Sequence, residues 1–203
     1  MAIANYSDIL TAITDHLDRP DLSGFRADFF TIGENRVYRD LRIRAMETAY
    51  SAVISSGVAS LPSDYVELKS AYVNTSPTTP LQRNSVEYIY SQFPTRSAEG
   101  IPKYIAREGS SFIFGPYPDS SYTIKGIYYA RLTALSSSNT TNWFTTNAPE
   151  ILLYAGLCAA EKFIANDERV QLWQSMYETL KEAIQQEDRK EQFSGSGLRM
   201  VAF

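Results

Sequence analysis

The chain has 203 residues, of which 44% are apolar, 21% charged and 13% aromatic, as is typical of a globular protein with a sizeable core. Its 19 basic and 23 acidic residues give a net charge of −4, which argues against a protein that wraps nucleic acid by electrostatic attraction. A single His and a single Cys exclude an intrachain disulfide and leave too few ligands for a Cys/His zinc site.

The longest apolar run is too short to span a membrane. It extends from Ile151 to Ala160, ten residues, whereas a bilayer-crossing helix needs roughly 20. We therefore expect a buried helix there and no membrane partner. Residues Met1 to Asn5 have neither a basic start nor a long apolar stretch, so we expect no signal peptide and synthesis in a cytoplasm.

Charge density divides the chain into three parts. Residues 1–59 carry 14 charged side chains, the longer span 60–145 carries 13, and residues 146–203 carry 15. The middle part holds most of the prolines and many Ser, Thr and Tyr, which favour strands and turns. We therefore predict an α+β chain, mainly α, with a small antiparallel β domain inserted into a helical bundle. The expected boundaries are 1–60 for the first part of the bundle, 61–142 for the β-rich insertion, 143–190 for a helical hairpin that completes the bundle, and 191–203 for an extended C-terminal arm.

The first part predicts two helices. Ser7 is positioned to cap a short helix, which ends at Arg19-Pro20-Asp21. A longer helix is expected from about Leu22 to Ala52, and Gly33 is placed where it would kink or split that helix.

The middle part predicts several short strands. Tyr65 to Val73 is rich in β-formers, and Tyr122 to Arg131 alternates in the manner of a strand. Between them we expect shorter elements, namely strands at Thr79–Gln82, Lys103–Arg107 and Ser111–Phe114 and a helical turn at Ser85–Gln92.

The last part predicts an antiparallel helical hairpin. Asn147 and Glu150 have the spacing of a capping box, and Pro149 suits the first turn of a helix. Asn166-Asp167 is expected to separate this helix from a second amphipathic one. We expect Trp143 and Trp173 to anchor the core.

No catalytic, cofactor-binding or metal-binding residues are predicted. His16 lacks an acid or nucleophile partner, and Cys158 lies in an apolar run typical of a core position. The phosphate-binding, dinucleotide-binding, nucleophile-elbow and zinc-protease motifs are all missing from the sequence. We therefore expect a protein that is not an enzyme.

A cluster of arginines and a surplus of tyrosines are each open to two interpretations. Four arginines within nine residues are candidate subunit-interface or channel charges: Arg36, Arg39, Arg42 and Arg44. The interleaved acids Glu34, Asp40 and Glu47 favour ion pairs within the helix and between subunits, and contact with DNA in a pore is the alternative. The tyrosines of the β part favour packing of a thin sheet, and stacking on bases or sugars is the alternative. They are Tyr104, Tyr117, Tyr122, Tyr128 and Tyr129.

The C-terminal segment combines a flexible composition with an apolar tip. Gly195 and Gly197 precede four large apolar residues and one cation, namely Leu198, Arg199, Met200, Val201 and Phe203. Apolar residues on a mobile tail favour docking, either back on the same protomer or into a neighbouring or partner chain.

Taken in order, a set of short motifs resembles the head-to-tail adaptor (connector, neck) proteins of tailed double-stranded DNA phages, from about residue 6 to 200. The motifs are Asp18-Arg19-Pro20-Asp21-Leu22, Arg39-Asp40-Leu41-Arg42, Met46-Glu47, Leu61-Pro62-Ser63-Asp64-Tyr65, Gly100-Ile101-Pro102-Lys103-Tyr104, Phe114-Gly115-Pro116-Tyr117-Pro118-Asp119, Asn142-Trp143-Phe144, Ala148-Pro149-Glu150, Asn166-Asp167-Glu168-Arg169 and Gly195-Ser196-Gly197-Leu198-Arg199-Met200. No one of them is diagnostic, and the resemblance lies in their number and order.

The resemblance implies a structural virion protein of the head–tail neck, assembled in the host cytoplasm. In such proteins a ring, commonly of about twelve copies, lies beneath the portal protein, extends the channel for double-stranded DNA and gives tail or nozzle proteins a docking face. The C-terminal arm tends to reach onto the portal. An acidic chain suits a pore through which DNA slides without specific binding.

Two other functions are compatible with the sequence. The first is another neck component, such as a stopper or tail-completion protein. The second is a carbohydrate- or nucleic-acid-binding module that uses the tyrosine-rich sheet.

Overall fold

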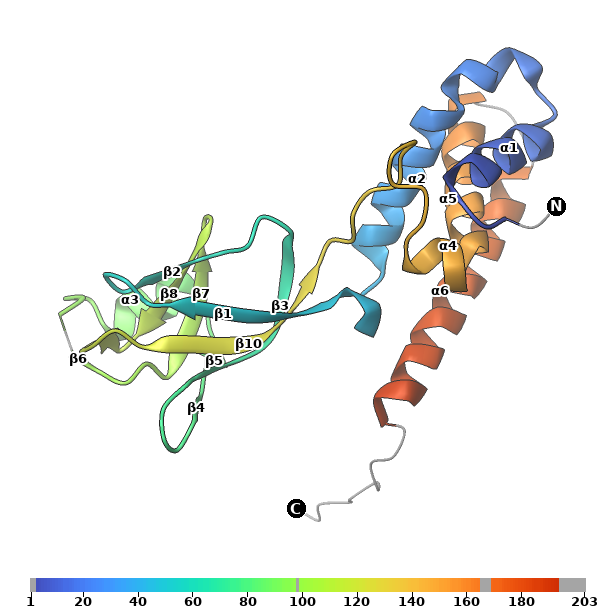
Figure 1. The fold of residues 1–203 in the computed structure, drawn as a ribbon. Coiled ribbons are helices and arrows are strands. Elements are labelled where there is room, and N and C mark those ends of the chain that lie inside the picture. Colours follow the sequence, from blue (N-terminus) through green and yellow to red (C-terminus); the bar gives the residue numbers. More distant parts are fainter. Residues whose placement is uncertain (1–2, 98, 165–168, 194–203) are drawn as a thin grey trace. The chain divides into compact units, whose positions relative to one another are not determined.

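The chain folds into two compact units, one helical and one β-rich (Figure 1). The computed structural model describes residues 3–97, 99–164 and 169–193. The helical unit combines Met1–Ala45 with Leu132–Phe203, and the β-rich unit is Met46–Arg131. The predicted α+β architecture, with a β domain inserted between helical segments, is confirmed. The insertion begins at Met46 rather than at residue 61 and ends at Arg131 rather than at residue 142, because strands occupy both ends of this range.

The first helix, α1 (Tyr6–Leu17), is capped two residues earlier than the sequence predicts. The side chain of Asn5 accepts a hydrogen bond from the Asp8 amide at 3.1 Å, so Asn5 is the N-cap. Ser7 lies in the first turn, and its hydroxyl donates to the same Asn5 oxygen at 2.6 Å.

The second helix is much shorter than expected. A 3-10 helix, η1 (Pro20–Phe25), leads into α2 (Arg26–Asp40), and the backbone turns extended at Leu41, with φ −110° and ψ 141°. The Arg42 guanidinium donates to the carbonyls of Tyr38 and Leu41 at 2.8 and 2.7 Å, which satisfies acceptors that the helix end leaves open. Another 3-10 turn, η2 (Arg44–Met46), precedes strand β1. The predicted continuation of the helix to Ala52 was therefore wrong.

Gly33 brings two helices into close contact and does not interrupt α2. A Cβ atom at Gly33 would lie 2.5 Å from the Gly156 nitrogen and 2.7 Å from the Ala155 carbonyl carbon, both in α5 (Pro149–Ile164). Because both obstacles are backbone atoms, α2 and α5 approach to a distance that only glycine permits at this position.

The remaining helices of this unit are a short helix with a capping box and the two long helices of the hairpin. Helix α4 (Trp143–Asn147) begins at a capping box in which Asn142 and Thr145 bond reciprocally, so Asn147 is the last residue of α4 and not the cap of α5. Helices α5 and α6 (Arg169–Phe193) lie side by side. The start of α5 faces the last turns of α6, which confirms an antiparallel pair. The predicted separator Asn166-Asp167 lies outside the described residues.

The β-rich unit contains two four-stranded sheets. One sheet has the order β1-β10-β3-β4 and the other β2-β8-β7-β5, while β6 and β9 form a separate parallel pair. Most pairings are antiparallel, and β5 pairs with β7 in parallel. The bounds are β1 Glu47–Val53, β2 Val58–Ser60, β3 Tyr65–Val73, β4 Thr79–Pro80, β5 Gln82–Arg83, β6 Glu99–Gly100, β7 Tyr104–Glu108, β8 Ser111–Gly115, β9 Tyr117–Pro118 and β10 Thr123–Ala130.

The two sheets share one aromatic core. Phe112 lies edge-on to Tyr50 and Tyr65, with ring centroids 5.7 and 5.6 Å away. On the opposite face of the second sheet, Ile113 packs with Ile89 of α3 (Val86–Gln92). The alternation of strand side chains between two buried faces explains why this sheet is apolar on both sides.

Candidate functional site

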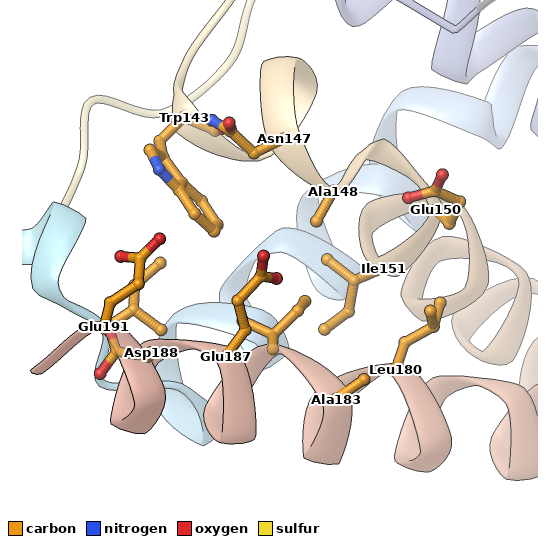
Figure 2. A pocket seen from close by; sticks show the side chains of 12 residues that line it. Trp143, Asn147, Ala148, Glu150, Ile151, Leu180, Ala183, Glu187, Asp188 and Glu191 are labelled. Atoms are coloured by element: carbon orange, nitrogen blue, oxygen red, sulfur yellow. The ribbon is translucent and has the colours of Figure 1, made fainter. Parts of the chain in front are cut away.

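A groove with an apolar floor lies on the helical unit. Its volume is about 360 Å³. One wall comes from α4 and the start of α5, and the facing wall comes from the last turns of α6 (Figure 2). The lining residues are Ile43, Trp143, Asn147, Ala148, Glu150, Ile151, Leu180, Ala183, Ile184, Glu187, Asp188 and Glu191.

The floor of the groove is apolar and fixed. Ile43, Ile151 and Ile184 are buried in the core of the unit. Trp143 is half-buried, and its ring stands edge-on to Phe144 with centroids 5.2 Å apart. Figure 2 shows the Trp143 ring and the Glu187 side chain directed into the groove from opposite walls. The apolar side chains that the groove leaves in contact with water are those of Trp143, Leu180 and Ala183. An apolar segment of another chain or of this one could cover them.

The rim of the groove is acidic. Four carboxylates line it and no Lys or Arg does, so it attracts cations. Two of them have partners from Arg44, whose backbone amide donates to Asp188 at 2.7 Å and whose guanidinium lies 4.0 Å from Glu191. Glu150 and Glu187 are exposed and have no hydrogen bond or ion pair with any described residue.

Arg36 joins α2 to α6 within the helical unit. It lies 3.5 Å from Asp40 and 3.3 Å from Glu178, and it donates to Gln174 at 3.0 Å. Its guanidinium carbon stands 3.9 Å from the Tyr177 ring centroid. Arg36 and Asp40 therefore form the expected ion pair within the helix. The other contacts of the Arg36 side chain also lie within the helical unit.

The other three arginines differ in exposure. Arg42 caps α2 through backbone carbonyls, and Arg44 reaches the α6 residues of the groove rim. Arg39 is exposed at the end of α2. Arg39 and Arg44 are thus the members of the cluster whose charge faces solvent.

Two of the three interleaved acids, Glu34 and Glu47, make contacts other than the expected ion pairs. Glu34 is buried and accepts hydrogen bonds from the Leu135 amide at 2.9 Å and the Tyr38 hydroxyl at 3.2 Å. It therefore ties the segment that precedes α4 to α2. Glu47 begins β1 and lies 2.5 Å from Lys69, so it belongs to the β-rich unit. Sequence spacing missed both roles because the Leu135 amide and Lys69 are distant along the chain from Glu34 and Glu47.

The tyrosines of the β-rich unit are largely part of its core. Tyr128 is buried beside Tyr50 and donates a hydrogen bond to Asp64 at 3.0 Å. Tyr122 donates to Asp119, and Tyr104 packs edge-on against Tyr88. Tyr117 and Tyr129 are half-buried. This arrangement agrees with the packing interpretation, with hydroxyls at the rim of the sheets.

His16 and Cys158 are the two residues that the sequence offers as candidates for catalysis. His16 is exposed on α1, and its Nδ1 lies 2.8 Å from the Ala12 carbonyl oxygen. Cys158 is buried, and burial raises the pKa of its thiol. Within the described parts of the chain, no group of three or more His, Cys, Asp or Glu side chains is arranged to hold a metal ion.

Among the described residues, no helix combines the length and apolarity that a bilayer crossing requires. The predicted arm residues Gly195, Gly197, Leu198, Arg199, Met200, Val201 and Phe203 lie outside the described residues.

The groove itself was missed by sequence reasoning, since it depends on α4 meeting the far end of α6.

Comparison with known proteins places the chain in one family. The family described as SU10 adaptor protein matches residues 4–200, which is nearly the whole chain. No curated protein matches the chain significantly. Because the match covers both units and the groove, the chain belongs to the SU10 adaptor protein family, a family of phage adaptor proteins.

Proposed function

We propose that this protein is a structural component of the phage neck that assembles as a ring of about twelve copies beneath the portal. The ring would extend the channel for double-stranded DNA and give tail proteins a docking face. The observation that carries the proposal is the family match over residues 4–200. The matched family is one of phage adaptor proteins, which supports a structural role.

The charges of the chain fit a channel through which DNA slides. With a net charge of −4, the chain repels phosphate on average. The side chains of Arg39 and Arg44 are exposed near the end of α2. We propose that they contact a neighbouring subunit. Pairing with acids of the next copy would hold a heterologous interface together without attracting DNA.

Residues 195–203 of the C-terminal arm are the proposed anchor on the portal. Its large apolar residues, Leu198, Met200, Val201 and Phe203, would lose contact with water on docking, and Arg199 supplies one charge. The portal, tail proteins and further copies of this chain are therefore the expected partners, at the neck of a virion assembled in the host cytoplasm.

Co-sedimentation with purified portal rings tests the anchor. The full chain should sediment with the rings at saturable stoichiometry, and a chain that ends at Phe193 should remain in the supernatant. Arg39→Glu is the matched variant for the subunit interface, since it leaves the arm intact and should reduce the number of copies bound per ring. Equal binding of the full and shortened chains would contradict the role of the arm.

A further inference from the structure

We propose that, in the free protein, the groove of the helical unit holds residues 194–203 of the chain's own C-terminal arm. The groove has an apolar floor, and its acidic rim includes two carboxylates with no described partner, Glu150 and Glu187. A portal would then have to compete with the groove for the arm. Because the readouts below use the free protein, the groove contact and the portal contact can fail separately.

The chemistry of the arm complements that of the groove. From Leu198 to Phe203 the arm carries large apolar side chains and a single charged residue, the cation Arg199. For the apolar side chains of the arm, the groove offers the partly exposed side chains of Trp143, Leu180 and Ala183. For Arg199 it offers four carboxylates. Burial of the apolar side chains supplies the driving force, and the ion pair selects the register.

The order of residues along the arm also matches the groove. Three of the acids, Glu187, Asp188 and Glu191, lie toward the end of α6 where the arm begins. The apolar part of the α6 wall, Leu180 to Ile184, lies farther back along the helix. A chain that reverses after Phe193 would bring Leu198 and Arg199 to the acidic end first and Met200, Val201 and Phe203 to the apolar end afterwards.

The length of the arm is sufficient for this path. The α6 wall from Leu180 to Glu191 is about 17 Å long at 1.5 Å per residue. Six extended residues, Leu198 to Phe203, cover about 20 Å. The preceding Ser-Gly-Ser-Gly at 194–197 supplies up to about 13 Å for the reversal, and its glycines permit backbone conformations that other residues resist.

The arm of the same chain is favoured over that of a second copy by proximity. Because the arm follows directly on α6, a joint of only four residues gives it an effective concentration of the order of millimolar at the groove. At micromolar protein concentrations an intermolecular arm of equal affinity would not compete.

Fluorescence of Trp143 gives a direct test. The chain has two tryptophans, so Trp173→Phe makes Trp143 the sole reporter. Removal of residues 194–203 from this variant should shift the emission maximum to the red, since the ring becomes more exposed to water. A synthetic peptide of residues 194–203 should then reverse the shift saturably. Identical emission with and without the arm, at unchanged far-UV circular dichroism, would overturn the proposal.

Charge reversal identifies the register. Glu187→Lys should reproduce the red shift of the shortened chain, and Arg199→Glu in the same molecule should restore the original emission. Glu182→Lys is the matched control, because Glu182 is an exposed α6 residue outside the groove lining. A Glu182→Lys variant that shifts the emission as much as Glu187→Lys would contradict a specific contact.

Disulfide trapping separates the two sources of the arm. With Cys158→Ala removing the native thiol, Ala183→Cys in the groove and Val201→Cys in the arm should oxidise to a monomeric cross-linked species. A cross-linked dimer as the main product would show that a second copy supplies the arm, and failure to cross-link would show that the arm does not dock there. Either result overturns the proposal.

Discussion

Gly33 sets the distance between the two central helices of the helical unit. Gly33→Ala places a methyl group within 3 Å of the α5 backbone. Because the nearest atoms belong to the backbone and not to a side chain, they cannot move aside by a change of rotamer. We expect a loss of about 1–3 kcal/mol of unfolding free energy in urea denaturation. Gly24→Ala is the matched control, since nothing lies within 4 Å of the added Cβ. Equal stabilities for the two variants would contradict the close approach.

Tyr177 makes the stability of the helical unit sensitive to alkaline pH. Burial, followed by its hydrogen bond to Asp40 at 2.8 Å, raises the pKa of the Tyr177 hydroxyl above its usual value. Burial likewise raises the pKa of Tyr50, in the other unit, to about 12. Since the folded chain holds these protons more tightly than the unfolded chain does, their contribution is complete below pH ~10 and is lost as the pH rises further.

The pH effect is measured as a difference between variants. Tyr177→Phe should cost about 1 kcal/mol at neutral pH, and the gap to the natural chain should narrow as urea titrations move above pH ~10. A gap that stays constant through this range would contradict the raised pKa of Tyr177.

At the scale of elements, the start of α4 depends on Asn142. Its side chain closes the capping box with Thr145 and donates to the Tyr38 hydroxyl at 3.2 Å. Asn142→Ala should therefore destabilise the helical unit by about 1 kcal/mol, measured by the loss of helical circular dichroism on heating. Asn147→Ala, at the exposed end of α4, should change the midpoint much less, and the reverse ranking would favour Asn147 as the cap.

The elements differ in how far the sequence determines them. The sequence predicts a strand over Tyr65–Val73, with the bounds that β3 has, because the β-branched and aromatic residues of this segment themselves favour a strand. The segment after Asp40 was wrongly predicted as helix because Leu41 and Ala45 continue the helical spacing of Val37. Pairing of residues 47–53 with β10 overrides that pattern, and a partner some 75 residues away along the chain leaves no local signal.

The same limit applies to the groove. The sequence showed the amphipathic pattern of α6 and the presence of Trp143, but not that they face each other. The sequence predicts ion pairs within the helix and between subunits for Glu34. Instead its buried carboxylate accepts a hydrogen bond from the Leu135 amide, about a hundred residues later. Spacing reveals contacts within a helix and misses those that only the packed unit creates.

At the scale of the whole molecule, the β-rich unit is an insertion with adjacent ends. Strands β1 and β10 pair antiparallel, with Glu47 opposite Tyr129, so the chain enters and leaves this unit at one place. Residues 46–131, with a core of their own, should fold when produced alone, and cooperative thermal unfolding with dispersed amide NMR signals would show it. An unfolded fragment would show that the unit depends on the helices.

Electron microscopy of portal rings mixed with this protein tests the adaptor role most directly. The full chain should add a new ring layer to the portal, and a chain that ends at Phe193 should add none. Portals that show no additional layer with the full chain at saturating concentration would contradict the portal-adaptor role.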